Sequence, residues 1–402
     1  MPRIAYLESI RGVAALQVLL LHFLAAFAPD LVYSLPAGAA IAGYVHLSPL
    51  YFLYDGYSAV YIFFALSGYV LTRSFERHLA RPSAQPMVSQ VLARVVRLGL
   101  PALAATFIAA AMMWMFGKSN IVAGDLSGST WFASQWNTDV SILSIISDGT
   151  INALFLGYRE QSLVAPLWTL SIEFYGSMII LLLCACARRS RVVWWLAVLL
   201  GAMFTIRSAY VCFFMGHLLA AFRRAERPAP DSKLLPIFSI VFGVFLCVMA
   251  DVWQPQWLWS LCADPTYFLF PGQSAPMQQK AFGAILVLVG IFDLEVARSF
   301  LSRPWLVARS RLSFPLYLVH WPILFGPAAA LFLLLNSFVG IEIARVGAIA
   351  AGICLAFVAS ALFSPADRCA LDLSRRLRQR LSASLEASRA PAARVARVVA
   401  AE

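Results

Sequence analysis

The chain has 402 residues, of which 61% are hydrophobic and only 13% are charged, and its mean hydropathy is +0.77. A soluble globular domain has about 25% charged and about 45–50% apolar residues, so this composition excludes a water-soluble enzyme and a disordered or fibrous chain. The net charge of +11 bears on topology rather than on nucleic acid, because Lys and Arg prefer cytoplasmic loops. The class that fits is an all-α, polytopic bundle of transmembrane helices.

Ten segments are apolar enough to predict membrane spans, since about 20 apolar residues cross the hydrocarbon. In chain order they are 12–29, 51–72, 98–116, 167–187, 192–206, 208–222, 234–250, 281–296, 312–335 and 343–364. The fifth and sixth are short, and the eighth is the weakest. The sequence around Ala26-Phe27-Ala28 resembles a signal-peptidase site, but Pro29 would block cleavage, so we expect the first span to be retained.

The basic residues predict the orientation of these spans. Ten crossings put both termini on one side, and if that side is the cytoplasm, 26 of the 31 basic residues lie inside. The five outside are Lys118, Arg159, Arg207, Lys280 and Arg345. The positive-inside rule therefore predicts cytoplasmic termini.

The last residues differ in character from the spans. Residues 1–368 form the predicted membrane domain, and residues 369–402 a basic, amphipathic cytoplasmic tail. Leucines recur there at every fourth position from Leu373 to Leu385, as in a helix that lies on a membrane surface.

Two segments are expected outside the membrane. Residues 117–166 form a long polar loop, and residues 252–280 carry Trp253, Trp257 and Trp259. Exposed aromatic rings can stack on sugars, but Trp is common at any membrane interface, and we favour the interfacial explanation.

Ionisable side chains inside a membrane are costly, so each is a candidate functional residue. Arg11 lies at the cytoplasmic mouth of the first span, and His22 lies eleven residues deeper, nearly on the same helix face and about 16 Å away along the axis. Glu173 lies in the outer half of the fourth span, where a carboxylate must be paired or protonated. His22, also in the outer half, is its expected partner, although a packing role for this histidine stays open. His320 in the ninth span is a second intramembrane histidine.

Arginines gather at the cytoplasmic mouth of the third span. Arg94 and Arg97 share one helix face, and Arg73, Arg77 and Arg81 fall on the same side of the membrane. A guanidinium group binds phosphate with a planar fork, so this cluster suits a phosphorylated ligand. The positive-inside bias explains the number of arginines but not their paired spacing.

The second span ends in the motif Phe63-Phe64-Ala65-Leu66-Ser67-Gly68-Tyr69, which contains the small residues Ser67 and Gly68. Ser and Gly permit close approach of another helix or of a ligand. The motif alone does not decide between these two explanations.

Together, five motifs in order resemble those of the membrane acyltransferase-3 family. They are Glu8-Ser9-Ile10-Arg11-Gly12 followed by His22-Phe23, Phe63-Phe64-x-x-Ser67-Gly68-Tyr69, Arg94-x-x-Arg97, Leu167-Trp168-Thr169-Leu170-Ser171-x-Glu173-x-Tyr175 and Tyr317-Leu318-x-His320-x-Pro322. They extend over residues 8–322. Glu8 stands where the family often has Asp, and Thr169 where it has Ser, and both keep the chemical type.

The resemblance implies transfer of an acyl group, usually acetyl, from cytoplasmic acyl-CoA to a hydroxyl of an extracytoplasmic carbohydrate or similar acceptor. It makes His22 the expected general base and Glu173 the group that orients or charge-balances it. Donor contacts are then expected from Arg11, Ser67, Gly68, Arg94 and Arg97, and acceptor contacts from Trp168, Tyr175, Tyr317 and His320. Direct transfer is favoured, and an acyl-histidine intermediate stays open.

The expected partners are membrane lipid, acyl-CoA and a carbohydrate or glycolipid acceptor, without nucleic acid, and the expected location is the bacterial cytoplasmic (inner) membrane. The seven cysteines have no metal-ligand spacing, so we expect no metal. The chain resembles a stand-alone member, without an added hydrolase-like domain. A proton-coupled transporter, which would also place His and Glu within the membrane, is the alternative. A non-catalytic scaffold would need no such groups.

Overall fold

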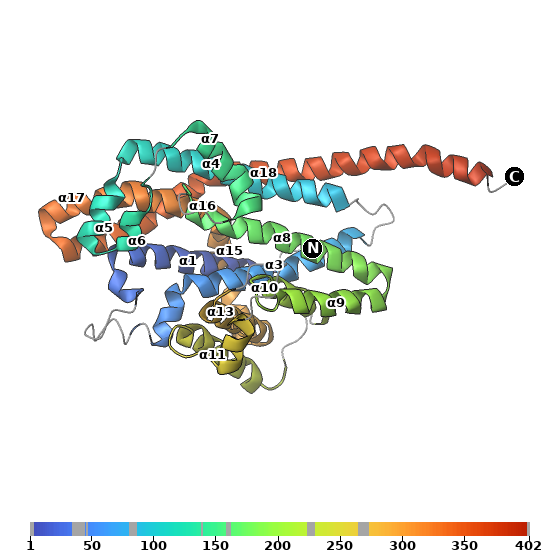
Figure 1. Cartoon of the computed structure of the whole chain (residues 1–402), viewed down its shortest axis with the longest axis horizontal. Coiled ribbons are helices and arrows are strands. Elements are labelled where there is room, and N and C mark those ends of the chain that lie inside the picture. The colour runs from blue at the N-terminus through green and yellow to red at the C-terminus, as the bar shows by residue number, and fades with distance from the viewer. Residues whose placement is uncertain are drawn as a thin grey trace.

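The computed structural model describes residues 4–33, 45, 47–79, 87–137, 140–157, 162–222, 230–263 and 273–399. Within these residues the regular structure is entirely helical. Most of the longer helices run along one common direction and form a bundle (Figure 1). The all-α, polytopic fold predicted from composition is therefore confirmed.

The α-helices are α1 (Ala5–Phe27), α3 (Gly56–Leu79), α4 (Met87–Phe116), α5 (Ser119–Ser127), α6 (Thr130–Ser134), α7 (Ile142–Ser147), α8 (Trp168–Arg189), α9 (Arg191–Thr205), α10 (Tyr210–Phe222), α11 (Leu234–Met249), α12 (Gln256–Ala263), α13 (Ala275–Asp293), α14 (Glu295–Leu301), α15 (Pro304–Ser310), α16 (Ser313–Ile323), α17 (Ala329–Val339) and α18 (Ile341–Val399). Shorter 3₁₀ or π segments are η1 (Pro29–Leu31), η2 (Pro49–Tyr54), η3 (Asp148–Leu156), η4 (Ala165–Leu167) and η5 (Leu324–Ala328).

Each of the ten predicted spans coincides with a helix. In the described part of the chain, seven helical segments are long and apolar enough to cross a membrane. The predicted spans at 192–206, 208–222 and 234–250 correspond to α9, α10 and α11, which have 15, 13 and 16 residues. The weak eighth span corresponds to α13, whose 19 residues begin before the predicted start.

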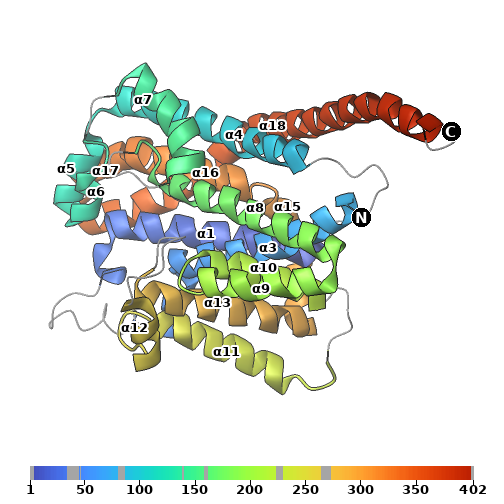
Figure 2. The same ribbon diagram turned by 45° about the vertical axis from the view of Figure 1, so that its right-hand side comes forward.

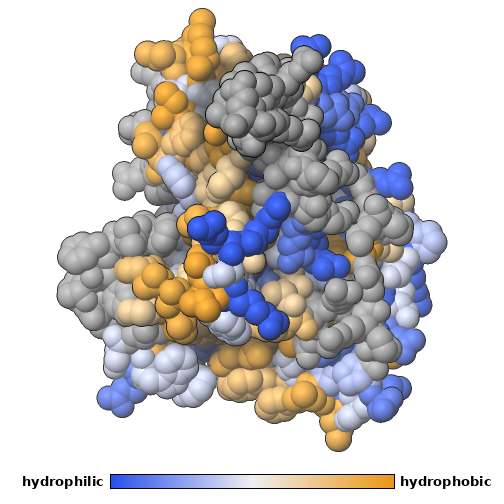
Figure 3. All heavy atoms as spheres, turned by 90° about the vertical axis from the view of Figure 1, so that its right-hand side faces the viewer, coloured by the Kyte–Doolittle hydropathy of each residue, from blue (hydrophilic) through white to orange (hydrophobic). Residues whose placement is uncertain are grey.

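The helix α1 lies inside the bundle, where it contacts α3, α15, α16 and α18 (Figure 2). It begins at the same end of the bundle from which α18 projects (Figure 1). Figure 3 looks onto that end and shows hydrophilic residues near the middle of the face. An even number of crossings, as predicted, is consistent with this arrangement.

A local irregularity follows His320. Between α16 and α17 the chain forms the π segment η5, which contains Pro327. Proline has no N–H to donate to the helix, so it disturbs the regular hydrogen-bond ladder at this point. His320 and Trp321 lie in the last regular turn before this disturbance.

Two expectations for the chain outside the spans need correction. The segment 117–166 is not one long polar loop, because α5, α6, α7 and η3 lie within it. The segment η3 packs closely on α4, since a Cβ atom added at Gly149 would lie 2.6 Å from the Cα atom of Leu103. The segment 369–402 was expected to be a tail on the membrane surface. Instead, α18 continues without a break beyond residue 368 to Val399, and this part of the helix projects away from the bundle (Figure 1).

Candidate active site

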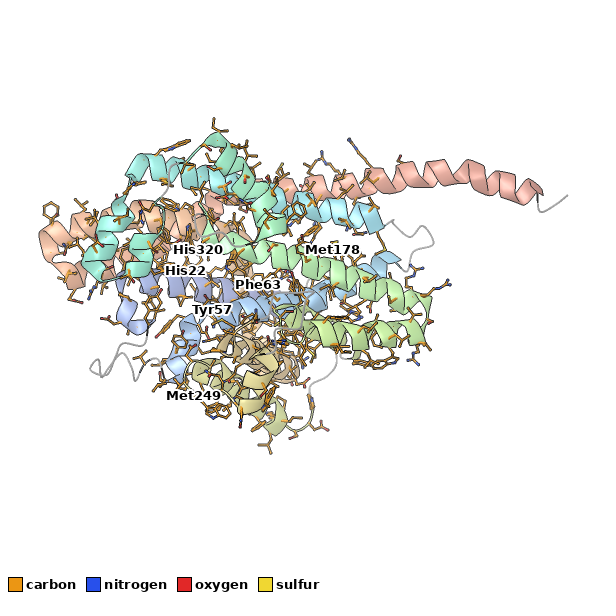
Figure 4. All side chains as sticks on the ribbon, in the orientation of Figure 1. His22, Tyr57, Phe63, Met178, Met249 and His320 are labelled. Carbon is orange, nitrogen blue, oxygen red and sulfur yellow. The ribbon has the colours of Figure 1, made fainter. Side chains whose placement is uncertain are left out.

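Two histidines from different helices meet inside the bundle. Nδ1 of His22 in α1 lies 2.9 Å from Nε2 of His320 in α16. Their rings are nearly coplanar and meet edge to edge, with centroids 5.1 Å apart and planes inclined by 16°, and His320 is fully buried. Figure 4 shows the two side chains next to each other in the interior. The sequence identified both histidines but not their contact.

The hydrogen bonds of this pair determine where the protons lie when both rings are neutral. Nδ1 of His320 lies 3.2 Å from the carbonyl oxygen of Leu316, which can only accept, so this nitrogen carries the hydrogen. Nε2 of His320 is then an acceptor, and Nδ1–H of His22 donates to it. Nε2 of His22 therefore keeps a free lone pair, as a proton acceptor requires.

Aromatic rings fix the orientation of His22. The ring of Trp131 in α6 is nearly parallel to that of His22, with centroids 5.7 Å apart and planes inclined by 10°. Trp321 forms a T-shaped contact with His22, with centroids 5.2 Å apart. These two rings and the hydrogen bond to His320 leave the imidazole little freedom to turn.

His22 lines a cavity of about 940 Å³, which we call the histidine cavity. Its wall also includes Tyr33, Trp131, Trp168, Asp251 and Lys280. Partial burial raises the pKa of Tyr33 to about 12, and nearby Tyr57 acts in the same direction, so Tyr33 stays protonated at neutral pH. Of the aromatic side chains named here, His22 is the one with a ring nitrogen whose lone pair can accept a proton.

A buried cluster of charges forms another part of the histidine cavity wall. Nζ of Lys280 lies 3.0 Å from Oδ2 of Asp55 and 3.5 Å from Oδ2 of Asp251. Lys280 and Asp55 are each 1% exposed in their side chains, and Ser58 also donates to Asp55. A buried lysine needs such partners, because an unpaired charge in this environment is very costly.

A second cavity, of about 620 Å³, lies beside it, and we call it the arginine cavity. The charged residues of its wall are Arg11, Arg94, Arg97, Arg311, Arg368, Glu8, Glu173 and Asp367. Five cations thus face three carboxylates, which leaves an excess of positive charge. The wall also contains Ser67.

The two predicted arginines of this cavity are both paired. Arg94 forms an ion pair with Glu173. Arg97 donates to Asp367 at 2.6 Å and lies over the ring of Phe314, 4.8 Å from its centroid. These contacts orient the guanidinium groups within the wall.

The expected pairing of Glu173 with His22 is wrong. Glu173 pairs with Arg94 in the arginine cavity, while His22 pairs with His320. The reason is the position of Glu173 along α8. Thr169, one turn earlier, contacts both cavities, whereas Glu173 lies one turn further and reaches only the arginine cavity, among the described residues.

Three other predicted contacts differ in the structure. Of the described residues, neither Gly68 nor Tyr175 lines either cavity. A Cβ atom at Gly68 would lie 2.2 Å from the carbonyl oxygen of Phe213, so Gly68 permits close packing of α3 on α10. Tyr175 is 38% exposed, because two residues turn it about 200° around α8 from Glu173. His320 was expected to contact the acceptor, but it is fully buried behind His22 and is not among the described residues that line the histidine cavity.

The remaining expectations for side chains have these outcomes. Arg73 pairs with Glu76 at 3.6 Å and is not among the described residues that line the arginine cavity. Arg81 and the side chain of Arg77 lie outside the described part of the chain, as does the side chain of Trp259. Trp253 and Trp257 are about half exposed, as expected for interfacial residues.

The two cavities share a wall. Val18, Val60, Thr169 and Tyr317 line both of them, and we call these four residues the shared wall. The Tyr317 hydroxyl donates to the carbonyl oxygen of Pro166 at 2.8 Å and lies 2.8 Å from Oγ1 of Thr169. All four residues are less than 10% exposed, and the two cavities adjoin at them.

Sequence reasoning missed two parts of the site. Trp131 was hidden in the segment expected to be a polar loop, and only its residue type was a signal. Lys280 was counted among the outside charges, although a single lysine directly before the long apolar run of α13 could have indicated a buried partner. No pattern in the sequence indicated that Asp55 or Asp251 is that partner.

Comparison with known proteins gives the following matches. The model of the acyltransferase domain family, Acyltransferase 3, matches residues 4–364. O-acetyltransferase PaAT-1 of Phomopsis amygdali is 28% identical over 338 residues, which cover 70% of this chain and 64% of that protein. The matched region thus spans less than two thirds of that relative's own length. No solved structure matches the chain significantly.

Proposed function

Because this chain belongs to the acyltransferase 3 family, we propose that it transfers an acyl group, with acetyl as the expected group, from cytoplasmic acyl-CoA to a hydroxyl of an extracytoplasmic carbohydrate or similar acceptor. The family resemblance in the motifs is confirmed, and membership decides for an acyltransferase-family enzyme over the transporter. The chain is a polytopic integral membrane protein. The donor, the acceptor and their sides of the membrane belong to the proposal.

The arginine cavity is the proposed donor site. Coenzyme A carries several phosphate charges, and Arg11, Arg94 and Arg97 supply guanidinium groups in one wall. Glu173 holds Arg94, and Asp367 holds Arg97, so these carboxylates act as positioning residues in the proposal. Ser67 lines the same cavity and can donate a hydrogen bond to the donor.

The arginine cavity faces the cytoplasm in this proposal. Arg11 lies near the start of α1, at the end of the bundle from which α18 projects (Figure 1). The positive-inside bias of the sequence puts the same end in the cytoplasm. Acyl-CoA would then enter from its own compartment, and the histidine cavity would open toward the other side.

The histidine cavity is the proposed acceptor site. Trp131 and Trp168 offer aromatic faces, and Asp251 and Lys280 offer charged groups that can hydrogen-bond to hydroxyls. A wall of this mixed kind suits a carbohydrate. The name of the fungal relative supports acetyl as the acyl group.

The proposed reaction is direct transfer with His22 as the base. The acceptor oxygen attacks the thioester carbonyl carbon while Nε2 of His22 takes the hydroxyl proton. The new C–O bond forms, the C–S bond breaks, and the proton passes from His22 to the leaving thiolate. An acyl-histidine intermediate would use the same nitrogen as a nucleophile.

His320 is a positioning residue for this base. By accepting from Nδ1–H of His22, it favours the tautomer with the lone pair on Nε2. The carbonyl oxygen of Leu316 fixes the tautomer of His320 in turn. His320, held by the carbonyl oxygen of Leu316, thus fixes the tautomer of His22, as the third member of a catalytic triad does for its histidine.

One observation carries the proposal: the arginines and His22 line two adjoining cavities with a shared wall. The test uses the full chain in nanodiscs with acetyl-CoA, and the release of free CoA thiol is measured with and without added oligosaccharides. We expect release by the wild type and a loss of about 10²-fold or more in His22→Ala. Absence of release from any acyl-CoA, or an unchanged rate in His22→Ala, would overturn the proposal.

A further inference from the structure

The shared wall lies between the two sets of groups that the reaction requires. Val18 precedes His22 by four residues in α1, and Thr169 precedes Glu173 by four in α8. Four residues are about one helical turn, or about 6 Å of axial rise. Figure 4 shows the same order along α3, where Tyr57 lines the histidine cavity and Phe63 the arginine cavity. The shared wall therefore lies about one helical turn from His22 on one side and about one helical turn from Glu173 on the other.

The wall has two chemically different halves. Tyr317 and Thr169 are tied to each other and to Pro166 by hydrogen bonds. Val18 and Val60 come from α1 and α3, which pack directly on each other. Both valines are branched at Cβ and therefore stiff, so they present a fixed apolar surface.

A bound donor must reach across this wall. With its phosphates held by arginines in one cavity, its carbonyl carbon must come within reach of the base that lines the other. The acyl group is the leading end of the donor and has to fit between the four residues. Close-packed side chains do not yield freely to extra methylene groups.

We propose that Val18 and Val60 set the largest acyl group that this enzyme transfers. This inference rests on the proposed function and adds to it the residues that determine donor specificity. The apolar half of the wall admits a short acyl chain and excludes a longer one by steric contact. Removal of two methyl groups from either valine enlarges the passage without touching a charged group.

The test compares donors of increasing length in the full chain in nanodiscs. CoA release is measured as kcat/KM for acetyl-, propionyl-, butyryl- and hexanoyl-CoA in the wild type, Val18→Ala and Val60→Ala. One methylene changes discrimination in an apolar pocket by about 10–200-fold. We therefore expect the ratio of butyryl to acetyl transfer to rise about tenfold or more in either variant, and to fall in Val60→Leu.

Matched controls come from valines that line one cavity each. Val70 of α3 lines the arginine cavity, and Val32 lines the histidine cavity. Val70→Ala and Val32→Ala should leave the ratio within about twofold of the wild type. Because Val60→Leu fills the wall rather than emptying it, it tests the idea even if an alanine variant does not fold.

The outcomes separate the two proposals. A wild type that releases CoA, with ratios that stay the same in Val18→Ala, Val60→Ala and Val60→Leu, would overturn the inference and leave the proposed function intact. An equal change in Val70→Ala would also overturn it. A wild type that releases no CoA from any donor would overturn the proposed function, and the inference with it.

Discussion

Replacement of His320 separates its positioning role from the role of the base. In His320→Ala, Nδ1–H of His22 loses the acceptor that lies 2.9 Å away. An unsatisfied buried donor costs about 1–3 kcal/mol, which corresponds to about fivefold to 150-fold in an equilibrium constant. This cost falls on the tautomer that has its lone pair on Nε2, so kcat should decrease by about that factor. His22→Ala should lose more, about 10²–10⁴-fold.

His320→Gln provides the matched conservative variant. The side-chain oxygen of Gln can accept from Nδ1–H of His22, so part of the lost kcat should return. The affinity for acetyl-CoA should stay unchanged in all three variants, because the donor arginines line the other cavity.

The assay is CoA release at saturating acetyl-CoA by the full chain in nanodiscs, together with donor affinity by calorimetry. His217→Ala is the control, since this buried histidine bonds Thr72 and Trp194 and is not among the described residues of either cavity. It should change the melting temperature but not kcat. A His320→Ala enzyme with wild-type kcat would refute the reasoning, and so would equal losses in His320→Ala and His320→Gln.

Three further predictions concern other parts of the molecule. Arg94→Ala and Arg97→Ala should each weaken acyl-CoA binding, measured by calorimetry, by about tenfold to a hundredfold, because each removes a charged hydrogen-bond donor worth about 1.5–3 kcal/mol. Unchanged affinity in both variants would mean that these arginines reflect only the positive-inside bias and not a donor site. A compartment-specific reporter fused after Glu402 should be active in the cytoplasm, and activity on the other side would contradict the ten-span arrangement. Lys280→Met should destabilise the fold by about 3–5 kcal/mol, because Asp55 loses its buried cation; the double variant with Asp55→Asn should recover most of the melting temperature, and a single variant as stable as the wild type would contradict this.

The sequence alone predicted the class of fold and the positions of most helices. Long apolar runs are a local property of the chain, and a membrane leaves helices as the natural way to satisfy the backbone of such runs. The even number of spans predicted a common side for the termini, and the charge distribution, which is also additive along the chain, predicted that this side is the cytoplasm. The motifs identified the family, and single residues such as His22, Arg94 and Arg97 were found because ionisable groups stand out in apolar surroundings.

Only the tertiary structure decided which of these residues meet. The sequence suggested that Glu173 and His22 pair with each other, yet Glu173 contacts Arg94 and His22 contacts His320, 298 positions away. Partner choice depends on how helices are rotated and shifted against one another, and the pattern of apolar residues in a span does not specify this when lipid and protein are both apolar. For the same reason, the sequence did not identify the shared wall or the partner of Lys280: each is made by residues from segments far apart in the sequence, which only packing brings within a few ångströms.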